Sequence, residues 1–358
     1  MKLKSSEVRK ILNNPIKIAD AANLVYVTQD ALTIERHRKG RGFIYIQNGE
    51  KIADKEAIAR FKDLVIPPAW QKVRISPHPN THLQVIGKDD KNRTQYRYHP
   101  YWEEISNTTK FFKMTDFGKV LPEIREKVAA DLRKRTMTRE KCLALVVSLM
   151  EDTHIRIGNE KYAKSNKSFG LSTLRTKHLR IDHEGVFFNF TGKKGKKHSI
   201  SIKDKKLRAL VMQCKEIPGW ELFQYYDEEG NHHAIDSGMV NEYIQTISDP
   251  SYSAKDFRTW AASKIFLESL VAMEIPENEN EIKNNIVEAC DMAAKNLGNT
   301  RSVCRNYYVH PAIIEKYENG TLFKYLDKKR ETTSDYDLEP IEQILMDVIS
   351  GYHFEIGD

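Results

Sequence analysis

The residues of this sequence that could do chemistry are cations, an asparagine and a tyrosine, spread in short groups along its second half. An arginine follows an apolar stretch, a lysine stands in a Gly-Lys-Lys turn, and two cations lie three residues apart. An asparagine then precedes a tyrosine by nine residues. Converging cations are typical of an anion site, and a tyrosine becomes a nucleophile only where its surroundings help it lose a proton. A surface arginine or a solvated turn lysine is the ordinary explanation of each group alone, but the set in this order is specific: Arg156, Lys193, Arg258, Asn299 and Tyr308.

Several other kinds of site are absent from the sequence. It contains no P-loop, Gly-x-Gly-x-x-Gly, His-Glu-x-x-His or Gly-x-Ser-x-Gly motif. This argues against an ATP-driven motor, a dinucleotide enzyme, a zinc protease and a serine hydrolase. The four cysteines lack the paired spacing of a zinc site, so we expect reduced thiols, no metal and no cofactor.

The positive charge is concentrated in one segment. The net charge is +7, yet residues 160–210 carry fourteen Lys or Arg and four Asp or Glu. Such a local field indicates a polyanion partner, because neutralised phosphates release counterions. The alternative is a solvated lysine-rich face. Residues 331–358 carry eight acidic residues and no Lys or Arg.

The five residues, in this order, resemble the active site of type IB DNA topoisomerases, in the compact bacterial and poxvirus branch. The resemblance extends over about residues 23–315 and leaves residues 1–22 and 316–358 unmatched. The segments that carry it are Val65–Trp70, Gly87–Tyr96, Ile155–Asn159, Ser168–Arg175, Phe190–Lys193, Asp256–Thr259 and Leu297–Thr300.

The resemblance implies a reaction in which the Tyr308 hydroxyl attacks a DNA phosphodiester, leaving a 3′-phosphotyrosine and a free 5′-hydroxyl. The bond energy is kept, so supercoiled DNA is relaxed and resealed without ATP or metal. Arg156 and Arg258 would hold the non-bridging oxygens, for which a guanidinium fork is suited. Lys193 would protonate the departing 5′-oxygen as general acid, because a guanidinium does not give up its proton.

Two points of the resemblance leave alternatives. Poxvirus and eukaryotic members carry histidine where this chain has Asn299, so the site has one fewer potential cation. Chemistry alone does not separate Tyr307 from Tyr308 as the nucleophile. The nine-residue spacing from Asn299 favours Tyr308.

A site-specific tyrosine recombinase is the main alternative function, and a non-enzymatic architectural DNA-binding protein is a third. Recombinases usually have His-x-x-Arg where this chain has Lys255 and Arg258, and they carry a helical amino-terminal half. The predicted DNA contacts are Gln95, Tyr96, Tyr98, Arg93, Lys194, Lys196, Lys197 and Lys255.

The elements that must position these residues form an α+β protein. The length of 358 residues allows about two domains. Strands are predicted at 23–28, 42–47, 72–75, 82–86 and 94–98, with a helix at 57–64. After Pro100 helices dominate, one of them opened by Pro122. They are interrupted by a three-stranded ribbon over 179–202 whose second turn carries Lys193.

The predicted architecture is a strand-rich DNA-clamp domain, residues 1–102, and a mainly helical catalytic domain, residues 103–358, which close on DNA as a clamp. The last helix, around Leu338–Val348, should have an acidic outer face. We expect a cytoplasmic, nucleoid-associated monomer that binds double-stranded DNA and no membrane. The first residues lack the apolar region of a secretory signal.

Overall fold

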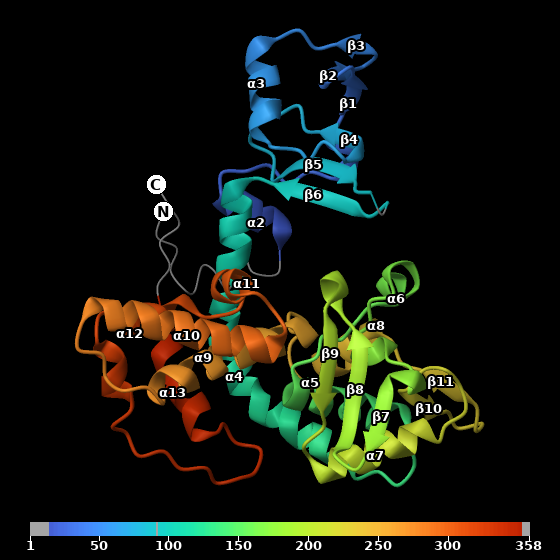
Figure 1. The fold of residues 1–358 in the computed structure, drawn as a ribbon, viewed down its shortest axis with the longest axis vertical. Helices are drawn as coiled ribbons and strands as arrows, with labels where there is room; N and C mark the ends of the chain where they lie inside the picture. Colours follow the sequence, from blue (N-terminus) through green and yellow to red (C-terminus); the bar gives the residue numbers. More distant parts are fainter. Residues whose placement is uncertain (1–13, 91, 353–358) are drawn as a thin grey trace. The chain divides into compact units, whose positions relative to one another are not determined.

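The computed structural model describes residues 14–90 and 92–352, and the described chain divides into two compact units (Figure 1). The first contains residues 14–112 and is rich in strands; the second contains residues 113–352 and is mainly helical. This confirms the predicted division into a strand-rich amino-terminal region and a larger helical region. The start of the chain, where no secretory signal is expected, lies outside the described residues.

The first unit is built on one antiparallel sheet with the strand order β3-β2-β1-β4-β5-β6. Phe61 of helix α3 (Lys55–Asp63) packs against Ile34, Val73, Ile75 and Val85 of the sheet to form its core. The strands are β1 (Ile34–Lys39), β2 (Gly42–Gln47), β3 (Glu50–Lys51), β4 (Gln71–Ile75), β5 (Leu83–Lys88) and β6 (Thr94–Tyr98). The helices are α2 (Pro15–Ala21), the 3₁₀ turn η1 (Gln29–Ala31) and α3 (Lys55–Asp63).

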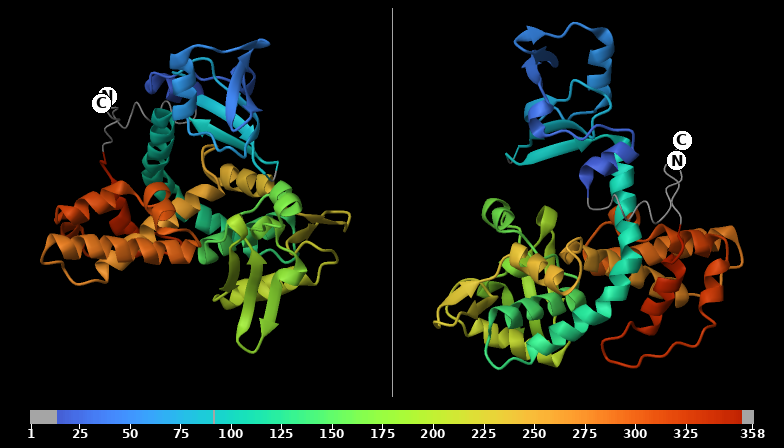
Figure 2. Two further views of the ribbon diagram at one scale, coloured as in Figure 1. Left: turned by 45° about the horizontal axis from the view of Figure 1, so that its top comes forward. Right: turned by 180° about the vertical axis from the view of Figure 1, so that it is seen from behind.

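The second unit is organised around two buried helices, α5 (Arg139–Thr153) and α9 (Ala254–Val271). The C-terminal helices α10 to α13 lie together in both views, orange to red in colour (Figures 1 and 2). The other helices are α4 (Pro100–Leu132, shared with the first unit), α6 (Glu160–Asn166), α7 (Lys205–Lys215), α8 (Ser237–Ile247), α10 (Glu279–Leu297), α11 (Arg301–Tyr307), α12 (Pro311–Glu318) and α13 (Pro340–Ile349). The 3₁₀ turns are η2 (Leu171–Thr173), η3 (Thr176–His178), η4 (Lys193–Gly195) and η5 (Thr321–Tyr325).

Two small antiparallel sheets interrupt these helices. The strands β7 (Leu179–Asp182), β8 (Gly185–Thr191) and β9 (Lys197–Ser201) form one, and β10 (Gln224–Tyr226) pairs with β11 (His232–Ala234) in the other. The turn between β8 and β9 contains η4 and presents Lys193. No helix among the described residues has the length and apolarity needed to cross a bilayer.

Two local predictions are wrong, and one strand was not predicted. Residues 23–28 form no strand, because Val25 makes only an isolated bridge to Thr81. Strand β1 was not predicted, because its mostly charged residues do not indicate that it pairs with β2 and β4. Pro122 does not open a helix but lies inside α4. The helix continues through it because Leu121 and Ile124 on either side are fully buried, and this packing outweighs the lost hydrogen bond.

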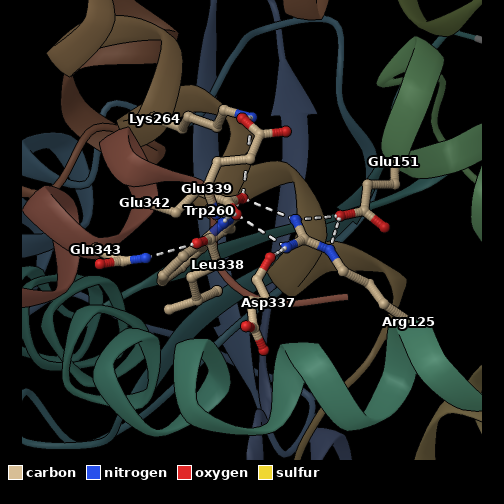
Figure 3. A network of polar contacts seen from close by, with 9 residues as sticks. All are labelled: Arg125, Glu151, Trp260, Lys264, Asp337, Leu338, Glu339, Glu342 and Gln343. Atoms are coloured by element: carbon tan, nitrogen blue, oxygen red, sulfur yellow. Dashed lines mark hydrogen bonds and ion pairs between the residues drawn. The ribbon is translucent and has the colours of Figure 1, made fainter. Parts of the chain in front are cut away.

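A buried ion-pair network joins α13 to the core of the second unit (Figure 3). The Arg125 guanidinium of α4 donates to both carboxylate oxygens of Glu342, at 2.8 and 2.9 Å, and to Glu151 of α5 at 2.6 and 2.8 Å. The indole of Trp260 on α9 donates to the same Glu342 carboxylate at 2.9 Å. Lys264 of α9 pairs with Glu339 at 2.6 Å. The network therefore fixes α9, which carries Arg258, against α4, α5 and α13.

The prediction that the last helix has an acidic outer face is therefore wrong in part, because one of its acidic residues is buried. Glu342 is 1% exposed, and burial alone would raise the pKa of its carboxyl, but the hydrogen bonds and charge of Arg125 lower it. Asp347 likewise accepts from Arg330 at 2.9 Å. Part of the acidic segment thus serves as internal partners for cations of the second unit.

We expect Arg125→Met to lower the free energy of unfolding by about 3–5 kcal/mol, because it leaves the Glu342 carboxylate buried without its main partner. Urea unfolding followed by tryptophan fluorescence measures the change. The control is Lys283→Met, which breaks an exposed pair with Glu279 and should have little effect. Equal destabilisation by the two variants would contradict the importance of the network.

Candidate active site

Arg258 lies at the centre of the site, in the second turn of α9. Ser253 caps this helix, with its backbone N–H and hydroxyl bonded to Asp256 at 2.8 and 2.9 Å. The Arg258 side chain is buried, and its guanidinium donates to the carbonyl of His154 and, at 3.0 Å, to the carbonyl of Leu297. Burial, followed by the charge of Arg156, lowers the pKa of Arg258 to about 10, against the raising effect of Tyr308.

Arg156 follows the end of α5, where His154 takes a left-handed conformation (φ 56°) and turns the chain. The Arg156 carbonyl accepts from the Leu171 N–H at 2.9 Å, which fixes this loop against a second one. A Cβ at Gly170 would overlap that carbonyl and the backbone of Gly158, so only glycine permits the close approach. The Ser168–Arg175 motif thus holds the backbone from which Arg156 projects.

Asn299 is placed by the end of α10. Gly298 takes the left-handed conformation there (φ 63°), and the Asn299 N–H bonds back to the carbonyl of Ala294 at 2.8 Å. The Asn299 side-chain oxygen accepts a hydrogen bond from Arg156. Its Nδ2 is buried and makes no hydrogen bond within the described part of the chain.

Tyr308 stands at the end of α11, a helix capped at its start by Thr300. Ser263 of α9 fixes the backbone around it. The Ser263 hydroxyl donates to the Tyr308 carbonyl at 3.1 Å and accepts from the His310 N–H at 2.9 Å. The Tyr308 ring centroid lies 5.6 Å from the Arg258 guanidinium carbon, and the side chain is half-buried. Tyr307 is 43% exposed.

The electrostatic environment of Tyr308 favours its ionised form. Burial by itself raises the pKa of the phenol. The charges of Arg258 and Arg156, a contact with the Arg258 side chain and the charge of Lys193 together outweigh burial, so the pKa of Tyr308 lies below its usual value of 10. Tyr308 therefore lies within electrostatic reach of all three cations of the predicted catalytic set.

A cavity of about 310 Å³ adjoins these residues, lined in part by Arg156, Lys193 and Arg258. Among the residues that the structure describes, no Asp or Glu lines this cavity. Asn299 and Tyr308 do not line it; they adjoin it through Arg156 and Arg258 respectively. The structure thus brings the five predicted catalytic residues together around a positively charged cavity suited to an anion.

The predicted DNA contacts of the second unit differ in their placement. Lys196 and Lys197 line the cavity, whereas Lys194, in a left-handed conformation (φ 62°), does not. All three side chains are exposed. Lys255 is exposed in the first turn of α9, one turn before Arg258.

The predicted DNA contacts of the first unit lie on or beside the edge strand β6. Tyr96 and Tyr98 stack with ring centroids 6.0 Å apart and are 42% and 37% exposed. Asp89 accepts from Gln95 at 2.9 Å and from Arg93 at 2.7 Å, so both side chains are held by the same carboxylate.

Sequence reasoning missed three residues that support the site. His154 supplies a carbonyl to Arg258, Ser263 fixes the backbone of Tyr308, and His198 lines the cavity beside Lys193. Backbone acceptors leave no mark in residue type. His198 alone carried a signal, since it follows the lysine-rich turn closely in sequence.

Comparison with known proteins agrees with this arrangement. The family described as "Eukaryotic DNA topoisomerase I, catalytic core" matches residues 100–335, and "Bacterial DNA topoisomerase IB, N-terminal domain" matches residues 42–89. The chain is 32% identical to DNA topoisomerase 1B of Acanthamoeba polyphaga mimivirus over 325 residues, which cover 88% of this chain and 96% of that protein. It is 24% identical to DNA topoisomerase 1B of Vaccinia virus (strain Copenhagen) over 263 residues, which cover 71% of this chain and 78% of that protein.

The chain belongs to the type IB DNA topoisomerase family. Its two family matches and its viral relatives agree with the compact bacterial and viral branch of that family. It is an enzyme of this type, which was the function predicted from the sequence.

We expect Arg258→Met to raise the pKa of Tyr308, because burial of the phenol then acts against less positive charge. Phenolate should then appear at higher pH than in the unaltered protein. Tyrosinate absorbance is measured as the difference between each protein and its Tyr308→Phe counterpart, since the chain has 16 tyrosines.

The control for this titration is Arg305→Ala, an exposed cation on the same helix as Tyr307. Its removal should leave the pKa of Tyr308 in place. A titration that shifts equally in both variants, or in neither, would show that Arg258 does not set the ionisation of Tyr308.

Proposed function

We propose that this topoisomerase cleaves one strand of duplex DNA with Tyr308 as nucleophile, forms a 3′-phosphotyrosine and a free 5′-hydroxyl, and then reseals the strand. The observation that carries the proposal is the convergence of Arg156, Lys193 and Arg258 on one cavity beside Tyr308, and the charges of these cations lower the pKa of that tyrosine. A phenol in such a field loses its proton more readily than in water. Because no carboxylate from the described part of the chain lines the cavity, the positive charge remains available to a phosphate.

The arginines and Asn299 would bind the non-bridging oxygens of the scissile phosphate. Arg258 Nε and Asn299 Nδ2 are both buried and make no hydrogen bond to the described residues. A buried donor without an acceptor is costly, and a phosphate oxygen would satisfy both groups. Because these donors are fixed before substrate arrives, they can stabilise charge that develops in the transition state.

Lys193 would protonate the departing 5′-oxygen. It is exposed on the turn between β8 and β9 and lines the cavity beside Arg156. An ammonium group can transfer its proton, whereas the guanidinium groups remain charged. On religation the same amine would accept the proton back from the 5′-hydroxyl, so each step regenerates the group that the other needs.

The reaction would need neither ATP nor a metal. The phosphotyrosine bond conserves the energy of the phosphodiester, so resealing requires no other source. Guanidinium and ammonium groups surround the cavity, and without a carboxylate the lining would repel a divalent cation. The charge stabilisation that a metal supplies elsewhere would come from the arginines.

The domain assignment and the DNA contacts follow from this proposal. Residues 1–102 would form the DNA-clamp domain and residues 103–358 the catalytic domain, which close around duplex DNA as a clamp. Stacked Tyr96 and Tyr98 support a DNA-contacting role for β6, and Lys196 and Lys197 support one for the turn before β9. We propose a monomer that acts at the nucleoid.

Relaxation of supercoiled plasmid in EDTA without ATP tests the function. The unaltered protein should relax plasmid that has no recombination site, at less than one monomer per plasmid. Tyr308→Phe should abolish both relaxation and the covalent DNA adduct trapped by detergent, while DNA affinity remains nearly unchanged because only one oxygen is lost. Tyr307→Phe is the matched control and should remain active.

An absolute need for Mg²⁺, or full activity of Tyr308→Phe, would overturn the mechanism. A dead Tyr307→Phe variant would move the nucleophile by one residue. Strand exchange that depends on a defined site would instead indicate a recombinase.

We expect Lys193→Ala to slow cleavage of ordinary DNA by ~10²–10⁴, the usual worth of a positioned proton donor. Replacing the scissile 5′-oxygen by sulfur should largely restore the rate, because a thiolate leaves without a proton. Single-turnover cleavage of the two substrates gives the measurement. Arg258→Ala serves as the comparison and should gain no such rescue, since sulfur at the bridging position does not relieve charge on the non-bridging oxygens.

A further inference from the structure

The imidazole of His198 is held between two glycines from distant parts of the sequence. A Cβ at Gly192 would lie 2.7 Å from His198 Nε2, and a Cβ at Gly298 would lie 2.7 Å from His198 Cε1. Real Cβ atoms do not come so close, so the ring occupies the space that a side chain at either position would need. The ring also stacks on Phe190, with centroids 4.9 Å apart and planes 16° apart.

Each of these glycines immediately precedes a residue of the proposed active site. Gly192 comes before Lys193, in the turn that leads from β8 to β9, and Gly298 comes before Asn299, after α10. His198 is therefore packed between the backbone that presents the proposed general acid and the backbone that presents a proposed phosphate ligand. It is also part of the cavity wall.

Just before the turn that carries Lys193, the Thr191 carbonyl accepts from the Phe169 N–H at 2.8 Å, which ties the end of β8 to the Ser168–Arg175 segment. Within the turn itself, the backbone hydrogen bonds are local. The Gly192 N–H bonds to the Lys196 carbonyl at 2.7 Å, and the Gly195 N–H bonds to the Gly192 carbonyl at 3.1 Å. These hydrogen bonds are internal to the turn, so they fix its form but not its position against α10. The contact of the His198 ring with Gly298 does constrain the position of the turn against α10.

We infer that His198 is a positioning residue, which sets the distance between Lys193 and the phosphate held by Arg156, Arg258 and Asn299. The inference rests on the proposed role of Lys193 as general acid. It explains why a ring with no assigned chemistry lies in a cavity that is also lined by six Lys or Arg side chains. Burial, followed by the charges of Lys196, Arg156 and Arg258, lowers the pKa of His198, which favours the uncharged imidazole.

The test compares oxygen and 5′-bridging sulfur substrates in single-turnover cleavage with enzyme in excess. His198→Ala should slow cleavage of ordinary DNA by about 10²-fold, as expected when a proton donor is misplaced by roughly 1 Å. The sulfur substrate should recover most of that loss, as it does for Lys193→Ala, because proton transfer is the step affected. DNA affinity should stay within about twofold. His183→Ala, an exposed histidine in the turn between β7 and β8, is the matched control and should behave like the unaltered enzyme.

A second variant keeps the test independent of His198 itself. Gly192 has an ordinary backbone conformation (φ −97°), so Gly192→Ala adds only the clash with the His198 ring. Gly192→Ala should show the same sulfur-rescued defect. The double variant with His198→Ala should be no slower than His198→Ala alone, because the ring that the new methyl group strikes is gone.

The outcomes separate this inference from the proposed function. If sulfur rescues Lys193→Ala but neither His198→Ala nor Gly192→Ala, His198 does not position the general acid and the inference fails alone. Unchanged cleavage in His198→Ala also overturns it. If sulfur fails to rescue Lys193→Ala itself, the general-acid role fails and the inference falls with it.

Discussion

Repulsion between like charges is the constraint on which this active site depends. Arg156, Arg258 and Lys193 converge around one small cavity, and within residues 14–90 and 92–352 no carboxylate lines it. A carboxylate would relieve the repulsion, but it would also neutralise the field that a phosphate and an ionising tyrosine require. The protein uses neutral acceptors instead. Backbone carbonyls of His154 and Leu297 bind Arg258, and the side-chain oxygen of Asn299 binds Arg156, so hydrogen bonds are satisfied while the charges remain.

Helix ends supply those neutral acceptors. The His154 carbonyl belongs to the residue that caps α5, and Leu297 is the last residue of α10. Carbonyls at a helix C-terminus have no partner within the helix and carry partial negative charge, which favours a cation. Arg258 therefore links the ends of two helices to α9. The buried pair of Arg125 and Glu342 fixes α9 from its other side, so carboxylates do appear in this unit, but as structural partners away from the cavity.

The sequence predicted what residue type and order reveal. The two-region architecture and the family followed from motifs, and the structure brings the five chosen residues into one site. The features that the sequence could not predict depend on partners that are remote in sequence. Glu342 looks like a surface acid until Arg125 and Trp260 surround it. Pro122 looks like a helix start until packing carries α4 through it. The role of His198 depends on glycines 6 residues before and 100 residues after it, whose meaning is the absence of a side chain.

The cations of the site differ in how they are held, and the difference matches what a reversible reaction needs. Arg258 is 4% exposed and fixed by carbonyls, so in the proposed mechanism it would stabilise charge on the phosphate without reorganising during either cleavage or religation. Lys193 is exposed at a turn and forms no ion pair with the residues that the structure describes, while the adjacent Gly192 packs against His198. An ion pair there would stabilise the protonated amine and hinder release of its proton. Because religation would reverse cleavage, the same amine would also accept a proton in the proposed mechanism, and a position set by the neutral ring of His198 would serve both directions.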